Sequence, residues 1–248
     1  MFLLIACSFP LLSSGGEDEV EEVNTEDYSE EEINGQPLAL EGGEPLDLNC
    51  EGGLMESAFD LQVYQTPDLP EPDPHQPFRD PVFGSCLVRV TDRDEDPMGD
   101  DPSRGLKNEY SRVQSFNADS SLLVVRSIEA FWYLYAAHSL QLLDELPVST
   151  EPRWDSQDPH LLYDFDESRL LAYHLDTGVV ESVHDFNQDF PGENLSAVWT
   201  RYEGSPSFDT RYWGLMAQDE NWDTIALLVY DLQNDTLVGK RMLPDKPS

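Results

Sequence analysis

The sequence is poor in basic residues. Its 248 residues include 14 Lys and Arg against 50 Asp and Glu, which gives a formal net charge of −36, and only three of the basic residues are lysines. A chain with this charge repels the phosphate backbone of nucleic acids, so we expect no DNA or RNA partner. It also repels anionic membrane surfaces, so we expect membrane attachment only through a covalent lipid anchor.

The sequence also lacks the common catalytic and metal-binding motifs. None of its five histidines stands at HxxxH or HExxH spacing, and no G-x-S-x-G, Walker or G-x-G-x-x-G pattern is present. The acidic stretch 92–101 has acids at alternate positions, but Pro97 stands where an EF-hand calcium loop needs glycine, so we interpret it as a solvated loop. The sequence therefore predicts no metal, no cofactor and no identifiable catalytic residue.

Cysteines are scarce, and Cys7, Cys50 and Cys86 include no C-x-x-C pair. This spacing indicates neither a zinc ribbon nor a thioredoxin-type redox site. Cys50 and Cys86 either form a disulfide, in an oxidising compartment, or remain two buried free thiols. Both alternatives stay open, because the sequence does not give the distance between the two Cα atoms.

The first ten residues, MFLLIACSFP, are apolar but too short to span a bilayer as a helix. Within them, Leu4-Ile5-Ala6-Cys7 resembles the lipobox of bacterial lipoproteins, although no Lys or Arg precedes the apolar run. The resemblance implies a signal remnant over residues 1–16, lipidation of Cys7 and a place in the bacterial cell envelope. The alternative is an apolar N-terminus with a chance cysteine.

An acidic and then proline-rich segment follows. Residues 17–32, EDEVEEVNTEDYSEEE, have too few large apolar side chains to offset the entropy lost on ordering. A helix is the competing interpretation, but like charges at i,i+4 oppose it. We predict a disordered tether over residues 17–78, with a short strand near 57–64, and a folded domain over residues 79–248 that opens with a strand pair in 81–91.

Residues 151–186 have the pattern of one four-stranded unit. Short apolar runs at 152–154, 160–165, 169–175 and 179–183 are separated by tight polar turns, and four strands in about 36 residues is the size of one β-propeller blade. Units of the same kind precede it at 110–147 and follow it at 205–240, with an insert at 187–202. We predict an all-β fold with about three to four antiparallel blades in an incomplete ring.

Each unit places a tyrosine at the same point, at Tyr135, Tyr173 and Tyr230, and we predict that these rings wedge between adjacent blades. The segments 205–209 (SPSFD) and 173–178 (YHLDTG) resemble the TolB-type and WD-repeat-like propellers of bacterial envelope proteins. The resemblance covers about residues 81–244 and implies the fold, not a function. Because the chain ends where a further blade would begin, we expect a truncated product, an open arc with one unpaired radial face.

If a site exists, propeller geometry places it at the central channel, lined by the first strand of each blade. The candidates are Tyr110, Arg112, Gln114, Arg153, Trp154, Trp199, Arg201 and Glu203. Arginines and aromatic rings on an acidic protein suit an anionic or sugar ligand, through bidentate hydrogen bonds and stacking. The alternative is that Trp154 is core between blades and that the arginines pair with nearby acids.

Three functional hypotheses follow. The first is a lipid-anchored envelope propeller, not an enzyme, that binds a protein or glycan partner. The second is an enzyme on acidic polysaccharide: the stretch 110–125 is similar to the blade start of oligogalacturonate lyases, although the histidines of their metal site are missing here. The third is a non-functional fragment.

Overall fold

The computed structural model describes residues 33–34, 36–50, 65, 69–92, 94, 96, 99–103 and 105–244. Lipidation at Cys7, the acidic tether at 17–32 and the expected strand at 57–64 lie outside the described residues. Among the described residues, no helix has the length and apolar character needed to cross a membrane.

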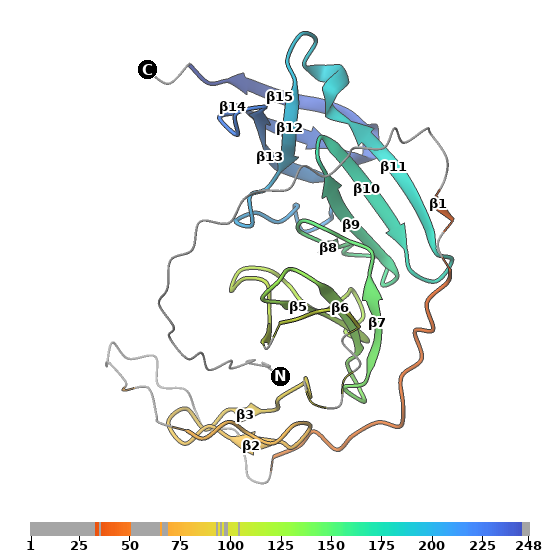
Figure 1. Cartoon of the computed structure of the whole chain (residues 1–248), viewed down its shortest axis with the longest axis vertical. Coiled ribbons are helices and arrows are strands. Elements are labelled where there is room, and N and C mark those ends of the chain that lie inside the picture. The colour runs from red at the N-terminus through yellow and green to blue at the C-terminus, as the bar shows by residue number, and fades with distance from the viewer. Residues whose placement is uncertain are drawn as a thin grey trace.

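The fold is all-β, as predicted, and its described part contains three successive antiparallel blades of four consecutive strands each, the second of which gains a fifth strand at its edge. Blade 1 contains β4 (Leu106–Lys107), β5 (Leu122–Ser127), β6 (Trp132–Ala136) and β7 (Leu142–Leu146). Blade 2 contains β8 (Arg153–Trp154), β9 (Leu161–Asp166), β10 (Arg169–His174) and β11 (Val179–Asp185). Blade 3 contains β12 (Leu195–Trp199), β13 (Tyr212–Asp219), β14 (Thr224–Asp231) and β15 (Thr236–Met242). Figure 1 shows the blades following one another along an arc, with a small hairpin of β2 (Phe78–Arg79) and β3 (Cys86–Leu87) at the blade 1 end.

Blade 2 confirms the strand pattern expected for residues 151–186, with every strand within two residues of its predicted bounds. β9 and β10 are nearly continuous apolar runs because both faces of their sheet are covered. Leu162 and Leu171 pack toward blade 1, whereas Phe165 and Leu170 pack toward blade 3. The turn after β10 closes at Gly178, whose φ of 72° lies in the left-handed region that glycine adopts without strain.

The inner strands of blades 1 and 3 differ from the prediction. In blade 1 the inner strand is β4 at 106–107, and Phe116 contributes only an isolated bridge to Leu123. In blade 3 the inner strand is β12 at 195–199, inside the segment assigned to an insert. Inner strands of two to five residues carry little periodicity in the sequence. The prediction therefore relied on the polar turns at 117–121 and 205–209 and placed the inner strands of blades 1 and 3 wrongly.

Three apolar clusters hold the arc together, one at each junction. Each contains one of the repeated tyrosines: Tyr135 between blade 1 and the 88–90 segment, Tyr173 between blades 1 and 2, and Tyr230 between blades 2 and 3. The predicted position between adjacent blades is therefore confirmed for Tyr173 and Tyr230, whereas Tyr135 packs between blade 1 and the 88–90 segment. At the junction of blades 2 and 3, His184 also bridges the carboxylates of Asp189 and Asp235, at 2.7 and 2.6 Å.

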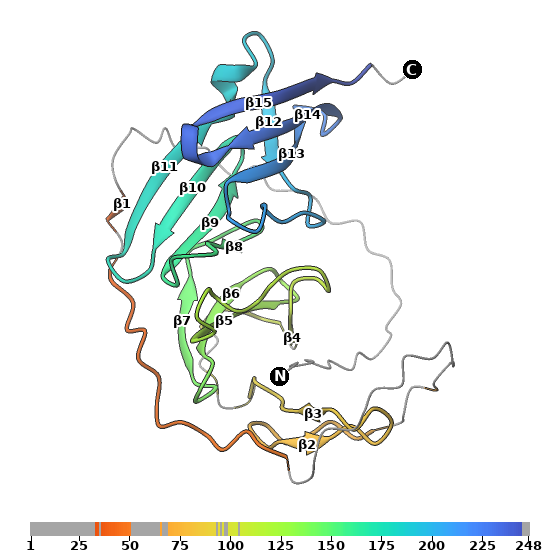
Figure 2. The same cartoon turned by 180° about the vertical axis from the view of Figure 1, so that it is seen from behind.

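The N-terminal part of the described chain is ordered against the blades, so the folded region begins well before residue 79. β1 (Ile33–Asn34) pairs with β11. Residues 36–50, which we call the strap, then run along the outer edge of the arc, as the orange trace in Figure 2 shows. The Leu38 N–H donates to the Leu175 carbonyl at 2.9 Å, and the Leu46 N–H donates to the His138 carbonyl at 3.0 Å. Leu38 and Leu48 also pack on the apolar clusters, burial that the charge-based tether prediction did not anticipate.

The strap ends in a covalent link. Cys50 and Cys86 form a disulfide with a Cα–Cα distance of 5.6 Å, which is the first of the two alternatives left open by the sequence. The disulfide joins the end of the strap to β3 and thereby to the hairpin beside blade 1.

At the other end of the arc, the outer face of blade 3 leaves Leu227 and Val229 of β14 exposed.

Candidate functional site

A cleft of about 630 Å³ opens where the inner ends of blades 1 and 3 approach each other. Blade 1 contributes residues from β4, the segment after it and β5. Blade 3 contributes residues from the end of β12, the segment after it, β13 and the β13–β14 turn. The lining residues are Lys107, Glu109, Tyr110, Arg126, Trp199, Arg201, Tyr202, Glu203, Gln218 and Trp222. Positive and aromatic side chains therefore predominate in the wall of this cleft.

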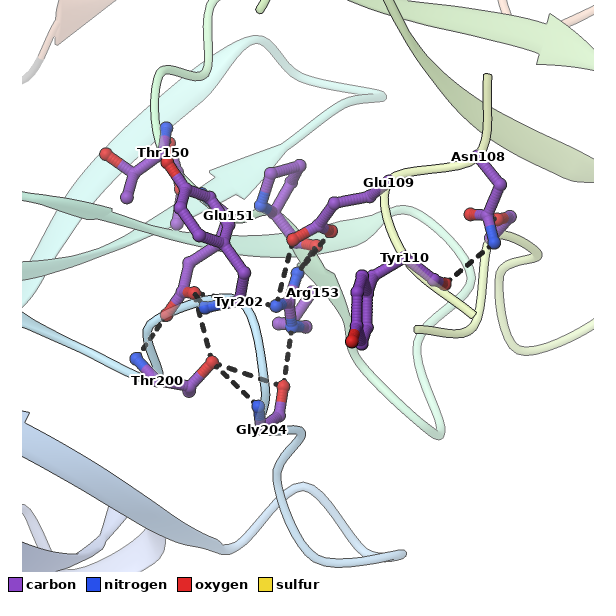
Figure 3. A network of polar contacts seen from close by, with 12 residues as sticks. Asn108, Glu109, Tyr110, Thr150, Glu151, Arg153, Thr200, Tyr202 and Gly204 are labelled. Carbon is purple, nitrogen blue, oxygen red and sulfur yellow. Dashed lines mark hydrogen bonds and ion pairs between the residues drawn. The ribbon is translucent and has the colours of Figure 1, made fainter. Parts of the chain in front are cut away.

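A buried ionic network lies beneath the cleft and joins all three blades. Arg153 of β8 is 3% exposed and donates from both terminal nitrogens to the Glu109 carboxylate, at 2.6 and 3.2 Å. Its Nε donates to the Gly204 carbonyl at 3.1 Å, so the guanidinium reaches from blade 1 to blade 3 (Figure 3). Arg153 thus supports the wall of the cleft from behind.

Glu151 is the second carboxylate of this network and has no exposed surface. Its Oε2 lies 3.6 Å from Arg153, and it also accepts hydrogen bonds from the Thr200 N–H, the Thr200 hydroxyl at 3.0 Å and the Tyr202 N–H at 2.7 Å. Burial raises the pKa of Glu109 and Glu151 above the usual carboxyl range, and the charge of Arg153 opposes that rise. The network therefore clamps the 200–204 segment that forms one side of the cleft.

Three lining residues adopt a left-handed backbone that bulky side chains rarely take. The φ angles are 56° at Arg201, 61° at Tyr202 and 60° at Trp222. The Glu151 hydrogen bonds hold the first two. Trp222 is held by its own N–H, which donates to the Asp219 carbonyl at 2.9 Å, and by its carbonyl, which accepts from Gln218 at 2.7 Å. Strained residues of this kind concentrate at functional sites, because the surrounding contacts must enforce them.

Three cationic side chains of the cleft form no ion pair. The side chains of Lys107, Arg126 and Arg201 make neither a hydrogen bond nor an ion pair with any described residue. Arg126 stands over the rings of Trp132 at 5.5 Å and Tyr202 at 5.9 Å, and its buried Nε finds no acceptor among the described residues. The two carboxylates of the cleft are instead paired: Glu109 with Arg153, and Glu203 with the exposed Arg112 at 3.3 Å. The cleft consequently presents three cationic side chains that are not held in ion pairs.

The residues predicted for the channel fall into two groups. Tyr110, Trp199, Arg201 and Glu203 line the cleft, whereas Arg112, Gln114, Arg153 and Trp154 do not. Arg112 is a surface partner of Glu203, and the exposed Gln114 accepts from the Phe116 N–H at 3.2 Å. Trp154 packs in the core between blades 1 and 2 and donates to the Ser115 carbonyl at 2.9 Å. The alternative interpretation, packing for Trp154 and acid partners for Arg112 and Arg153, therefore describes those three residues.

Several lining residues were not predicted from the sequence. They are Lys107, Glu109, Arg126, Tyr202, Gln218 and Trp222. A charge inside the apolar run LLVVRS was a usable signal for Arg126, since a strand buried on both sides seldom carries an unpaired guanidinium. Within the described ranges, no group of three or more His, Cys, Asp and Glu side chains is arranged to hold a metal ion.

Comparisons with known proteins give the chain no family. No family model matches it, and no curated protein matches it. Among solved structures, it is similar to "Dihydro-heme d1 dehydrogenase NirN in complex with DHE", at 15% identity and a TM-score of 0.29, over 57% of this chain and 37% of that one. A likeness this low carries no argument about function. The all-β, propeller-like fold rests on the blades themselves, and the resemblance to TolB-type and WD-repeat-like propellers stays a prediction.

Proposed function

We propose that this protein is a binding module that takes an anionic ligand in the cleft between blades 1 and 3. The observation that carries the proposal is the unpaired positive charge there. Among the described Lys and Arg side chains, four lack both a hydrogen bond and an ion pair: Lys107, Arg126, Arg201 and Arg241. Three of these four line the cleft.

The position of these three cations at one cleft favours the binding of anions. Three cations without an ion-pair partner at one cleft create a local positive potential within the negative field of a chain with 50 acidic residues. Such a potential concentrates anions, and guanidinium groups bind carboxylates and sulfates through paired hydrogen bonds. The clamped 200–204 segment holds Arg201 in place before any ligand arrives, which lowers the entropy lost on binding.

The proposal is tested with the full chain on dextran sulfate beads, with uncharged dextran beads as the blank. We expect retention that weakens as salt rises, and Arg126→Gln should lower the affinity about tenfold, because one charge-assisted contact is lost. Arg241→Gln, which removes an unpaired cation outside the cleft, is the matched control and should leave the affinity unchanged. Absence of retention, or equal losses in the two variants, contradicts the proposal.

We also propose that the module is attached to the bacterial cell envelope through a lipid on Cys7. This proposal rests on the Leu4-Ile5-Ala6-Cys7 motif alone. Labelled palmitate supplied to a bacterial host should be incorporated into the protein, and Cys7→Ser should abolish the label. The Cys50→Ser/Cys86→Ser variant, which removes only the disulfide cysteines, should keep it. Label that persists in Cys7→Ser shows that the anchor is not there.

A further inference from the structure

Exposed aromatic rings surround the unpaired cations of the cleft. Trp222, in the β13–β14 turn, is 60% exposed, and Tyr110, on the blade 1 side, is 40% exposed. Two open aromatic rings beside one cleft form a contact surface for a ligand with an apolar face. The cleft therefore offers apolar ring faces in addition to positive charge.

Hydrogen bonds to Gln218 hold the Trp199 ring and the Trp222 backbone in place before a ligand binds. Gln218, which is buried, accepts from Trp199 Nε1 at 2.7 Å and donates to the Trp222 carbonyl at 2.7 Å. Trp199 and Trp222 meet edge to face, with a centroid distance of 6.5 Å and an interplanar angle of 67°. This contact covers only part of the Trp222 ring and leaves most of its surface open to a ligand. An aromatic ring on a fixed backbone has few rotatable bonds and loses little entropy when a flat apolar surface stacks on it.

The combination of features narrows the ligand class. A simple inorganic anion or an acidic peptide would use the cations but not the open ring faces. A pyranose ring has a C–H-rich face that packs on an aromatic ring and hydroxyl groups at its edge, and an acidic sugar adds a carboxylate or sulfate for the arginines. The volume of about 630 Å³ lies in the range of ligand pockets and accommodates a short oligosaccharide.

We infer that the ligand of this cleft is an acidic oligosaccharide, with a sugar ring stacked on Trp222 and its carboxylate or sulfate bound by Arg126 and Arg201. This inference rests on the proposed anion binding and specifies the class of anion. Trp222 is then a specificity residue that distinguishes sugars from other anions, and the arginines distinguish acidic sugars from neutral ones.

Calorimetric titration of the full chain with four probes tests the inference: a hyaluronan hexasaccharide, a heparin hexasaccharide, the neutral chitin hexasaccharide and polyglutamate. Hyaluronan carries carboxylates only, whereas heparin carries sulfates in addition, so the two probes show whether sulfate adds affinity. We expect at least one acidic sugar to bind about tenfold tighter than both the neutral sugar and polyglutamate. Trp222→Ala should weaken the acidic sugar about five- to tenfold and leave the affinity for polyglutamate unchanged, because only the sugar stacks.

Phe208→Ala is the matched control, since Phe208 is 94% exposed and lies outside the cleft. It should change no affinity. If polyglutamate binds as tightly as the sugars and Trp222→Ala has no effect, the sugar inference is wrong while anion binding stands. If the neutral sugar binds as tightly as the acidic ones and Arg126→Gln has no effect, both proposals are wrong. Absence of binding by every probe contradicts both as well.

Discussion

Replacing Arg153 with methionine is expected to lower the free energy of unfolding by about 3–5 kcal/mol, which is the usual effect of removing one partner from a buried ion pair. The substitution leaves Glu109 and Glu151 buried without the guanidinium that both face. Glu151 keeps its contacts to Thr200 and Tyr202, but Glu109 loses both of the hydrogen bonds that hold its carboxylate. Urea unfolding followed by circular dichroism measures the change.

The surface pair of Arg112 and Glu203 supplies the control. Both side chains are more than half exposed, so Arg112→Met should change the free energy of unfolding by at most about 1 kcal/mol. A similar loss in both variants would contradict the role assigned to the buried network.

The Arg153→Met variant should also acquire a distinctive pH dependence. Burial raises the pKa of Glu109, and Arg153 is the first influence that opposes this rise, so its removal moves the folded-state pKa further above the unfolded value. An acid of this kind stabilises the fold below its unfolded pKa and loses that contribution as pH rises through the folded pKa. The variant should therefore recover part of its deficit, relative to the wild type, as the pH falls from neutrality toward the ordinary carboxyl range. A deficit that stays constant with pH would show that lost packing, rather than uncompensated charge, causes it.

Replacing Trp213 with alanine is expected to cost about 3–5 kcal/mol of stability, as large aromatic truncations in a core do. Trp213 of β13 is fully buried between blades 2 and 3, edge to face with Tyr163 at 5.8 Å and with Phe165 at 5.6 Å. Its indole N–H donates to the Thr210 carbonyl at 2.9 Å. Truncation leaves a cavity at the junction and the carbonyl without its donor. The midpoint of urea unfolding reports the loss.

Trp222→Ala removes the same side chain from an exposed position and should shift stability by about 0.5 kcal/mol or less. The two substitutions should thus have different effects: Trp213→Ala lowers stability, whereas Trp222→Ala lowers ligand affinity. If Trp213→Ala unfolds at nearly the wild-type midpoint, blades 2 and 3 do not share the core described above. The milder Trp213→Phe keeps the variant foldable and should lose an intermediate amount of stability.

Local signals made much of the fold predictable. The strands of blade 2 alternate with short turns whose chemistry is visible in the sequence, such as the Asp176-Thr177-Gly178 turn that ends at a left-handed glycine. The repeated tyrosines were also interpretable, because a large amphipathic ring at one point of each unit has few roles other than packing between units. These inferences needed only residues close together in the chain.

The candidate site was only partly predictable because its residues come together from distant parts of the chain. Arg126 and Trp222, both lining the cleft, are separated by almost a hundred residues, and no spacing rule connects them. Arg153 illustrates the opposite error. Its position on an inner strand was read correctly, but its buried pairing with Glu109 depends on a side-chain direction that the sequence does not specify.

The strap has a consequence for how the chain is assembled. Gly43 hydrogen-bonds to Gln141 across 98 residues, and its carbonyl accepts from His138 across 95. Each blade is a meander of neighbouring strands that closes short loops, whereas the strap can be placed only by closing very long ones. Because a ribosome makes the N-terminus first, the strap exists before every strand and turn it contacts in blades 1 and 2. The part of the fold that is synthesised earliest is therefore among the last to find its place.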